Sequence, residues 1–182
     1  MAWEITADEL LERYAAGERN FAGVDLNPSN SIDRGRVKLS RWDWVDKIVL
    51  DLSGINLRGA NLFRVELSRC NLSGADLFGA CLKNSGLAFS DLRNANLRGA
   101  YMYETVLTGA DLTGADLTYA NLTNAVLIDA NLTNVECDWS IWIGTNLTNS
   151  KPGGACYRDA ALIWHTTLSS GDIDPGPYLN NS

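Results

Sequence analysis

Leucine recurs at every fifth residue along the middle of the chain, without a slip from Leu52 to Leu147. Of the 20 central positions in this register 17 are Leu, and the exceptions Met102, Cys137 and Trp142 are also apolar. An amphipathic helix repeats its apolar stripe every three or four residues, and a half-buried strand every two. A period of five fits neither. A fixed short period indicates a solenoid, in which each unit buries its apolar face against its neighbours.

Each five-residue unit divides into an extended part and a turn. Two places before the centre the residue is usually small, with Ala in 10 of 20 units, and one place before it 12 of 20 residues are Asp or Asn. This inward–outward–inward order predicts extended backbone, with the small residue and Leu inside and the polar residue outside. The other two positions are rich in Thr, Ser, Gly and Asn, which suits a turn. One short strand and one corner per unit closes a square after four units.

These units match the signature A-(D/N)-L-x-x, so the chain resembles the pentapeptide-repeat family over much of its length. The resemblance implies an all-β solenoid, namely a right-handed quadrilateral parallel β-helix with about twenty residues per coil. The repeat region then makes five coils, each rising by about 4.8 Å, one strand spacing. The helix-then-repeat opening and the Ala-(Asp/Asn)-Leu body look like cyanobacterial members, which informs fold and source more than activity.

Residues 1–182 are predicted to form a single domain with consecutive parts. These parts are a capping α-helix at 6–17, first repeat units at 18–26, an irregular insertion at 27–47, the β-helix at 48–163 and a C-terminal cap or tail at 164–182. Thr6 and Glu9 fit a capping box, and Gly17 suits the helix end. A helix there would cover the open end of the solenoid. The five-residue register is expected to continue beyond Lys151 to Leu162.

The insertion at 27–47 is the largest departure from the repeat, and it contains Trp42 and Trp44. Two interpretations remain open. The two Trp side chains pack on the tube wall and complete the first coil, or the segment is a functional loop. In the second case the segment could build a lateral cleft, and an enzyme with its site there is a remote alternative.

Catalytic residues, a cofactor and a metal site are not predicted. Asp51, Asp91 and Asp111 share one predicted wall, but a convex tube filled by Leu and Ala offers no concave site to shift their pKa values. The Asp and Asn side chains are instead expected to bond to local backbone near the corners. The four cysteines show neither zinc-site spacing nor a C-x-x-C motif, so reduced thiols are expected. We therefore expect a protein that is not an enzyme.

Charge and hydropathy limit the partners. The net charge of −7 argues against generic nucleic-acid binding by phosphate neutralisation. No apolar run approaches the length needed to cross a bilayer, and the first residues lack the layout of a secretory signal. We expect a cytoplasmic location and a protein partner of unknown identity, with no membrane and no direct nucleic-acid binding. A monomer and an end-to-end dimer both remain open.

Stacking every twentieth residue sorts the outer side chains into columns, some of which are apolar where the repeat is ordinarily polar. Exposed apolar clusters often mark a partner surface. The candidate interaction surface comprises Phe63, Phe89, Tyr101, Tyr103, Val106, Val126, Ile128, Ile141, Ile143, Trp42 and Trp44. Either a partner binds these columns, or the terminal helix, the insertion or the tail covers them.

Charge is uneven along the tube. Residues 51–100 have a net charge of +2, whereas residues 101–150 contain no basic residue and have a net charge of −6. The acidic surface comprises Glu104, Asp111, Asp116, Asp129, Glu136 and Asp138. The sequence thus favours a non-enzymatic interaction or scaffold module, because an acidic rod attracts basic partners. The resemblance implies an alternative, a DNA-mimicking modulator of a type II topoisomerase such as gyrase.

Overall fold

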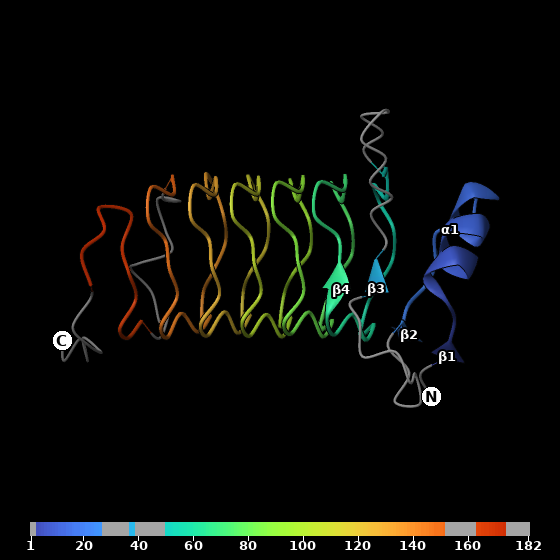
Figure 1. The fold of residues 1–182 in the computed structure, drawn as a ribbon, viewed down its shortest axis with the longest axis horizontal. Coiled ribbons are helices and arrows are strands. Elements are labelled where there is room, and N and C mark those ends of the chain that lie inside the picture. The colour runs from blue at the N-terminus through green and yellow to red at the C-terminus, as the bar shows by residue number, and fades with distance from the viewer. Residues whose placement is uncertain (1–2, 27–36, 39–49, 152–162, 174–182) are drawn as a thin grey trace.

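A computed structural model describes residues 3–26, 37–38, 50–151 and 163–173. The regular elements are β1 (Trp3–Glu4), α1 (Ala7–Ala15), β2 (Val24–Asp25), β3 (Val37–Lys38) and β4 (Val65–Glu66). Most of the remaining chain consists of single bridge residues separated by turns. Figure 1 shows these coils stacked side by side along the long axis, with α1 at one end.

Parallel bridges between residues twenty positions apart define four walls. Wall A contains Asn56, Asp76, Asn96, Asp116 and Glu136; wall B contains Asn61, Cys81, Tyr101, Asn121 and Ile141; wall C contains Glu66, Gly86, Val106, Val126 and Asn146; wall D contains Asp51, Asn71, Asp91, Asp111, Asn131 and Lys151. The five-residue period therefore produces the expected four-walled parallel solenoid. The right hand of the coil stays a prediction implied by the family resemblance.

Every corner is a tight turn with the same backbone geometry. In the first regular unit, Ile55 N donates to Leu52 O at 3.1 Å, and Gly54 has a φ of 65°. The residue two places after the centre has a positive φ in each unit from Leu52 to Leu147. A positive φ at this place, inside a turn closed by that hydrogen bond, is typical of a type II turn and favours Gly or Asn.

Where Asp or Asn stands before the centre, its side chain caps the corner of its own unit. Asp111 Oδ1 accepts a hydrogen bond from Thr113 N at 3.0 Å, and Asn121 Oδ1 accepts one from Thr123 N at 3.0 Å. The backbone hydrogen bonds between coils do not use the N–H groups of Thr113 and Thr123, so these donors are available to the side-chain oxygens. This confirms the prediction that these side chains bond to local backbone, and it explains why Asp and Asn dominate the position.

The interior is filled by the central residue and by the small residue before it. Leu112 and Ala110 are buried, as are their equivalents in neighbouring coils. Where Ser or Thr replaces the small residue, as at Ser85, Ser90, Thr105, Ser140 and Thr145, its hydroxyl donates to a backbone carbonyl. Ser90 Oγ, for example, lies 2.7 Å from Leu87 O. The inward and outward positions are therefore those that the repeat predicts.

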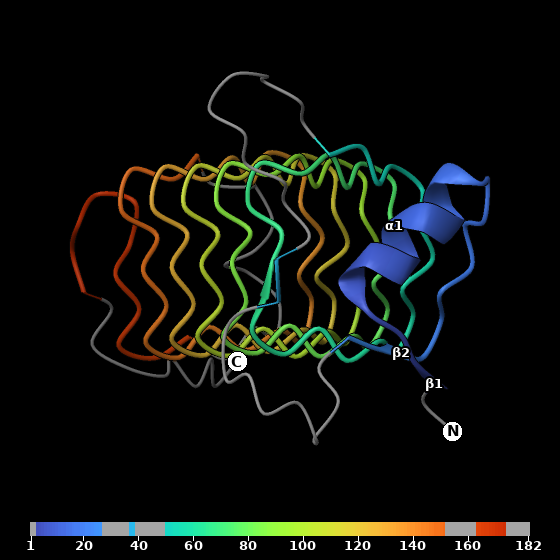
Figure 2. The same cartoon turned by 45° about the vertical axis from the view of Figure 1, so that its right-hand side comes forward.

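Helix α1 covers one end of the tube, as expected (Figure 2). Thr6 Oγ1 accepts a hydrogen bond from Glu9 N at 3.1 Å and forms the N-cap. Leu10 is fully buried, and the Tyr14 hydroxyl donates to Ser53 O at 2.9 Å. Gly17, with a φ of 99°, follows the helix end. The helix thus closes the apolar end of the tube with one apolar face.

The first coil departs from the sequence-based expectation. Phe21 N donates to Asn56 O and Leu26 N to Asn61 O in the next coil, so residues 18–26 contain two repeat units. The segment 27–47, however, is not one continuous interruption, because β3 pairs with β4 and supplies wall C. Lys38 follows Asp25 of wall B by thirteen residues and precedes Asp51 of wall D by thirteen, instead of five. In this coil, stacking on the neighbouring coil, rather than regular spacing, sets the place of wall C.

The register at the last described coil is shifted by one residue. Asn146 bridges Thr167, which is 21 residues later, and Leu147 N donates to Thr167 O at 2.8 Å. The last coil therefore contains one additional residue before Thr167, whereas the register predicted up to Leu162 falls on residues 152–162, which lie outside the described residues. Asn149 N donates to Ser169 O at 3.0 Å, so the tube extends past the predicted boundary at 163.

Replacing Leu112 by Ala should lower the free energy of unfolding by about 2–5 kcal/mol, because the tube walls cannot collapse into the cavity. Replacing the exposed Thr133 by Ala should change it by less than about 0.5 kcal/mol. Chemical denaturation of both variants measures the difference. Equal stabilities would contradict the inward and outward assignment.

Candidate interaction surface

The predicted apolar columns lie on two neighbouring walls. Tyr101 and Ile141 belong to wall B, and Val106 and Val126 are adjacent on wall C. Phe63, Tyr103 and Ile143 are turn residues that follow wall B, whereas Phe89 and Ile128 follow wall C. Tyr101 and Phe89 are 61% and 56% exposed, and the others are half-buried. Trp42 and Trp44 lie outside the described residues.

Four further exposed rings were missed in the sequence. One is Trp164 in the last coil, which is 43% exposed. The other three lie at turns of the regular coils, where polar residues were expected. Phe78, Tyr119 and Trp139 are 38%, 52% and 60% exposed. All three lie between wall A and wall B. We call this edge corner AB, which comprises residues 58–59, 78–79, 98–99, 118–119 and 138–139 of successive coils. Corner AB and wall B together form the aromatic side of the tube.

Cations cover five of the turn rings. Arg64 lies over its chain neighbour Phe63 at 5.0 Å, and the other four rings are each covered by a cation from the preceding coil. These four pairs are Arg58 over Phe78 at 4.3 Å, Arg69 over Phe89 at 5.1 Å, Lys83 over Tyr103 at 5.1 Å and Arg98 over Tyr119 at 5.0 Å, measured to the ring centroid. In each of the four the cation precedes the ring by 20 or 21 residues, which is one coil. Each contact contributes about 0.5–1 kcal/mol at an exposed site.

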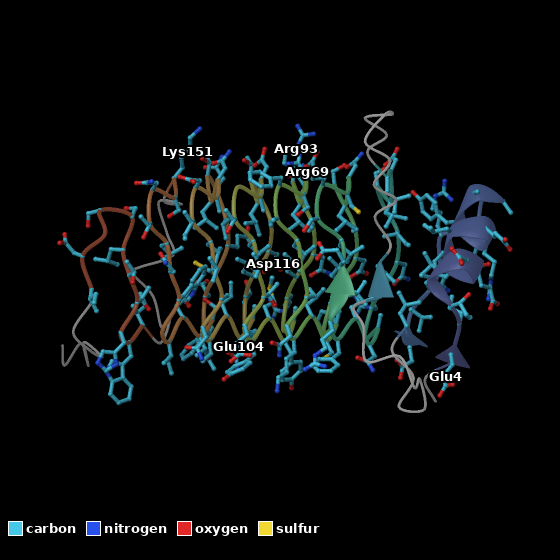
Figure 3. All side chains as sticks on the ribbon, in the orientation of Figure 1. Glu4, Arg69, Arg93, Glu104, Asp116 and Lys151 are labelled. Carbon is cyan, nitrogen blue, oxygen red and sulfur yellow. The ribbon has the colours of Figure 1, made fainter. Side chains whose placement is uncertain are left out.

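Wall D, on the opposite side from wall B, is polar. Arg93 donates twice to Asp91, from Nε to Oδ1 at 2.8 Å and from Nη2 to Oδ2 at 2.6 Å. This paired hydrogen bond holds the pKa of the Asp91 carboxyl below its ordinary value. Figure 3 shows Arg69, Arg93 and Lys151 along one edge of the tube, and Glu104 along the opposite edge. The tube therefore has chemically different sides.

Residues 101–150 form the coils that we call the upper coils. Their six acidic residues do not share one wall. Asp116 and Glu136 are neighbours on wall A, and Asp138 lies at corner AB. The others lie elsewhere around the tube, with Asp111 on wall D and both Glu104 and Asp129 in turns. Negative charge is thus distributed around the coils, with one group of three beside corner AB.

Within the described ranges, no group of three or more His, Cys, Asp and Glu residues is placed to hold a metal ion. None of the helices in that part of the chain is both long and apolar enough to span a bilayer.

The cysteines correct one expectation. Cys70 and Cys81 are free, but Cys137 is disulfide-bonded, so the predicted reduced state is wrong for Cys137. Cys156 lies outside the described residues. Coil stacking brings residues about twenty positions apart into contact, and for this reason the absence of a short motif did not exclude a disulfide. Burial raises the pKa of the Cys70 thiol to about 12, and the Glu66 carboxylate also raises it.

The stacked coils and filled interior define a repeat solenoid protein. The family model for pentapeptide repeats matches with eight copies, over residues 51–84, 80–118 and 90–129. A pentapeptide repeat protein of Nostoc PCC 7120, alr5209, is 32% identical over 76% of this chain and 84% of its own, with a TM-score of 0.23. The chain belongs to the pentapeptide-repeat family.

Other solved structures match the chain at lower identity. HetL from the cyanobacterium Nostoc sp. strain PCC 7120, which is involved in heterocyst differentiation regulation, is 22% identical over 93% of this chain and all of its own, with a TM-score of 0.35. QnrB1, a plasmid-mediated fluoroquinolone resistance protein, is 20% identical over 97% of this chain and 90% of its own, with a TM-score of 0.26. No curated protein matches the chain by sequence.

Thiol labelling should separate the cysteines. In the folded, unreduced protein at pH 8, iodoacetamide should modify the half-buried Cys81 and leave Cys70 unmodified, because burial restricts access and keeps the Cys70 thiol protonated. Peptide mass spectrometry identifies the sites. After denaturation without a reductant Cys70 should react and Cys137 should not. Alkylation of Cys137 under those conditions would contradict the disulfide.

Proposed function

We propose that the protein is a non-enzymatic protein-interaction or scaffold module that binds its partner through the aromatic side of the tube. The observation that carries this proposal is the exposure of Tyr101, Tyr119 and Trp139, each with more than half of its surface open. Aromatic residues are enriched in interface cores and dominate binding energies there. A surface that keeps such rings open in successive coils therefore favours association.

The backbone beneath these rings supports the proposal, because it is a rigid platform. Tyr101 N donates to Ala80 O at 2.9 Å, and Tyr119 N donates to Asp138 O at 2.9 Å. Each ring-bearing segment is thus bonded to a neighbouring coil. A surface that is ordered before binding loses little conformational entropy when the partner arrives.

Location and assembly are further parts of the proposal. A cytoplasmic location stays a prediction, and the disulfide at Cys137 favours an oxidising compartment instead. The monomer and the end-to-end dimer both remain open. The remote enzyme alternative depends on residues 27–47, of which only Val37 and Lys38 are described.

A photo-crosslinking amino acid in place of Tyr101 should capture a partner in an extract of the source organism. The same amino acid in place of Thr133, which is exposed next to wall D, is the matched control. Mass spectrometry should identify one protein enriched with the Tyr101 probe over the Thr133 probe. Equal products from both positions would contradict the assignment of the aromatic side.

A second candidate is a DNA-mimicking modulator of a type II topoisomerase such as gyrase. The distribution of charge favours this candidate, because Glu104, Asp111, Asp116 and Asp129 lie on different sides of the upper coils. Duplex DNA likewise presents negative charge on all sides. Such a rod could occupy the basic surface that normally binds the duplex.

A supercoiling assay tests this candidate. If the protein mimics DNA, it should alter gyrase supercoiling at micromolar concentration, and a variant with Glu104, Asp111 and Asp129 changed to the amides should act several-fold more weakly, since opposite charges attract across such an interface. No effect of the wild-type protein at that concentration would exclude the candidate.

A further inference from the structure

We infer that corner AB binds a basic segment of a partner protein, and that an Arg or Lys side chain of this segment covers the ring of Trp139. The inference rests on the proposed interaction function and specifies the chemistry of the partner.

Aromatic rings at the turns of the tube are regularly covered by cations, whereas the ring of Trp139 is covered by none in the part of the chain that the structure describes. Phe78, Phe89, Tyr103 and Tyr119 lie at turns, and each is covered by a cation from the preceding coil. Trp139 is the next ring at corner AB, one coil beyond Tyr119. The residues 20 and 21 positions before it are Tyr119 and Thr118, which are not cations. Among the described residues, no cation lies over the Trp139 ring, and Trp139 is 60% exposed.

At corner AB a ring and a carboxylate of the same unit lie close enough to contact one cation. Arg58 lies over Phe78 and also forms an ion pair with Asp76 of wall A at 3.2 Å. The cation therefore contacts a ring and an acid of the same unit. In the unit of Trp139 the position of Asp76 is occupied by Glu136, which is exposed. Ring and carboxylate are both present there, but the described chain supplies no cation.

The surface around Trp139 is acidic and therefore complementary to a basic segment. Residues 101–150 contain no Lys or Arg and have a net charge of −6. Glu136 and Asp138 are exposed beside Trp139, and Asp116 adjoins Glu136 on wall A. A single cation would not balance this charge, whereas a segment with several Arg or Lys residues would. Such complementarity increases the association rate and selects a basic partner.

Position along the corner supports the same conclusion. Gly23, Gly59, Gly79 and Gly99 occupy this turn position in the first four coils, where φ is positive. Tyr119 and Trp139 occupy it in the next two, with φ of 62° and 60°. A bulky residue with positive φ is strained relative to Gly, so the fold itself does not require a ring at this place.

Fluorescence anisotropy with a labelled peptide tests the inference on the full chain. The probe is a fluorescein-labelled peptide of six Arg alternating with Gly, at 50 mM NaCl, and the same peptide with Glu in place of Arg is its control. Trp139→Ala and Glu136→Gln should each weaken binding of the Arg peptide about fivefold, since both remove part of a cation site. Phe89→Ala and Glu104→Gln, also exposed turn changes, should weaken it by less than about twofold.

Three outcomes would overturn the inference. One is no measurable binding of the Arg peptide to the wild-type protein, and another is an equal loss in the site variants and their matched controls, which would indicate unspecific attraction to an acidic rod. The third concerns Arg158, which lies outside the described residues. If Arg158→Gln tightens peptide binding about fivefold, the chain's own arginine occupies the ring. A partner captured by the Tyr101 probe in any of these cases would leave the proposed function standing.

Discussion

The corner dihedral is the constraint on which the rest of the structure depends. A wall of only three extended residues can be followed by the next wall only if the chain turns sharply, and the turn requires a positive φ at its second residue. This geometry is the same at Gly54, Arg64 and Trp139, although their side chains differ greatly. Every fifth residue is therefore held in a conformation that most side chains disfavour, and the buried Leu and Ala residues together with the bonds between coils compensate for it.

Stacking of equivalent corners converts distance in sequence into contact in space. Arg98 and Tyr119 are separated by a whole coil in the chain, yet the guanidinium lies 5.0 Å from the ring centroid. Gly109 shows the same effect, because a Cβ atom there would lie 2.6 Å from the Phe89 ring. A side chain at one corner thus sets which residue is tolerated in the next coil. This coupling distributes rings, cations and carboxylates in columns, and it separates the aromatic side from polar wall D.

The sequence predicted what the repeat determines and failed where the repeat ends. The burial of Leu112 and the outward place of Asp111 follow from a five-residue alternation, and both were correct. The wall formed by β3 was not recognised, because its position depends on pairing with β4 rather than on spacing. Trp139 was missed because turn positions were classed by the composition of the repeat. A comparison of residues twenty positions apart would have found most of the cation–ring pairs.

Because each coil contains twenty residues, the length of the tube can change without changing the direction in which its side chains face. A duplication of one whole coil would lengthen the rod by about 4.8 Å and leave every column on its own wall. A duplication of one five-residue unit would preserve the core equally well, yet it would rotate all later residues by a quarter of a revolution. If the duplicated unit lay between Tyr119 and Trp139, Trp139 would leave the edge that carries Phe78 and Tyr119. Genetic change in such a protein can therefore keep folding intact while it reorients a recognition surface, and only insertions in multiples of a coil keep that surface aligned.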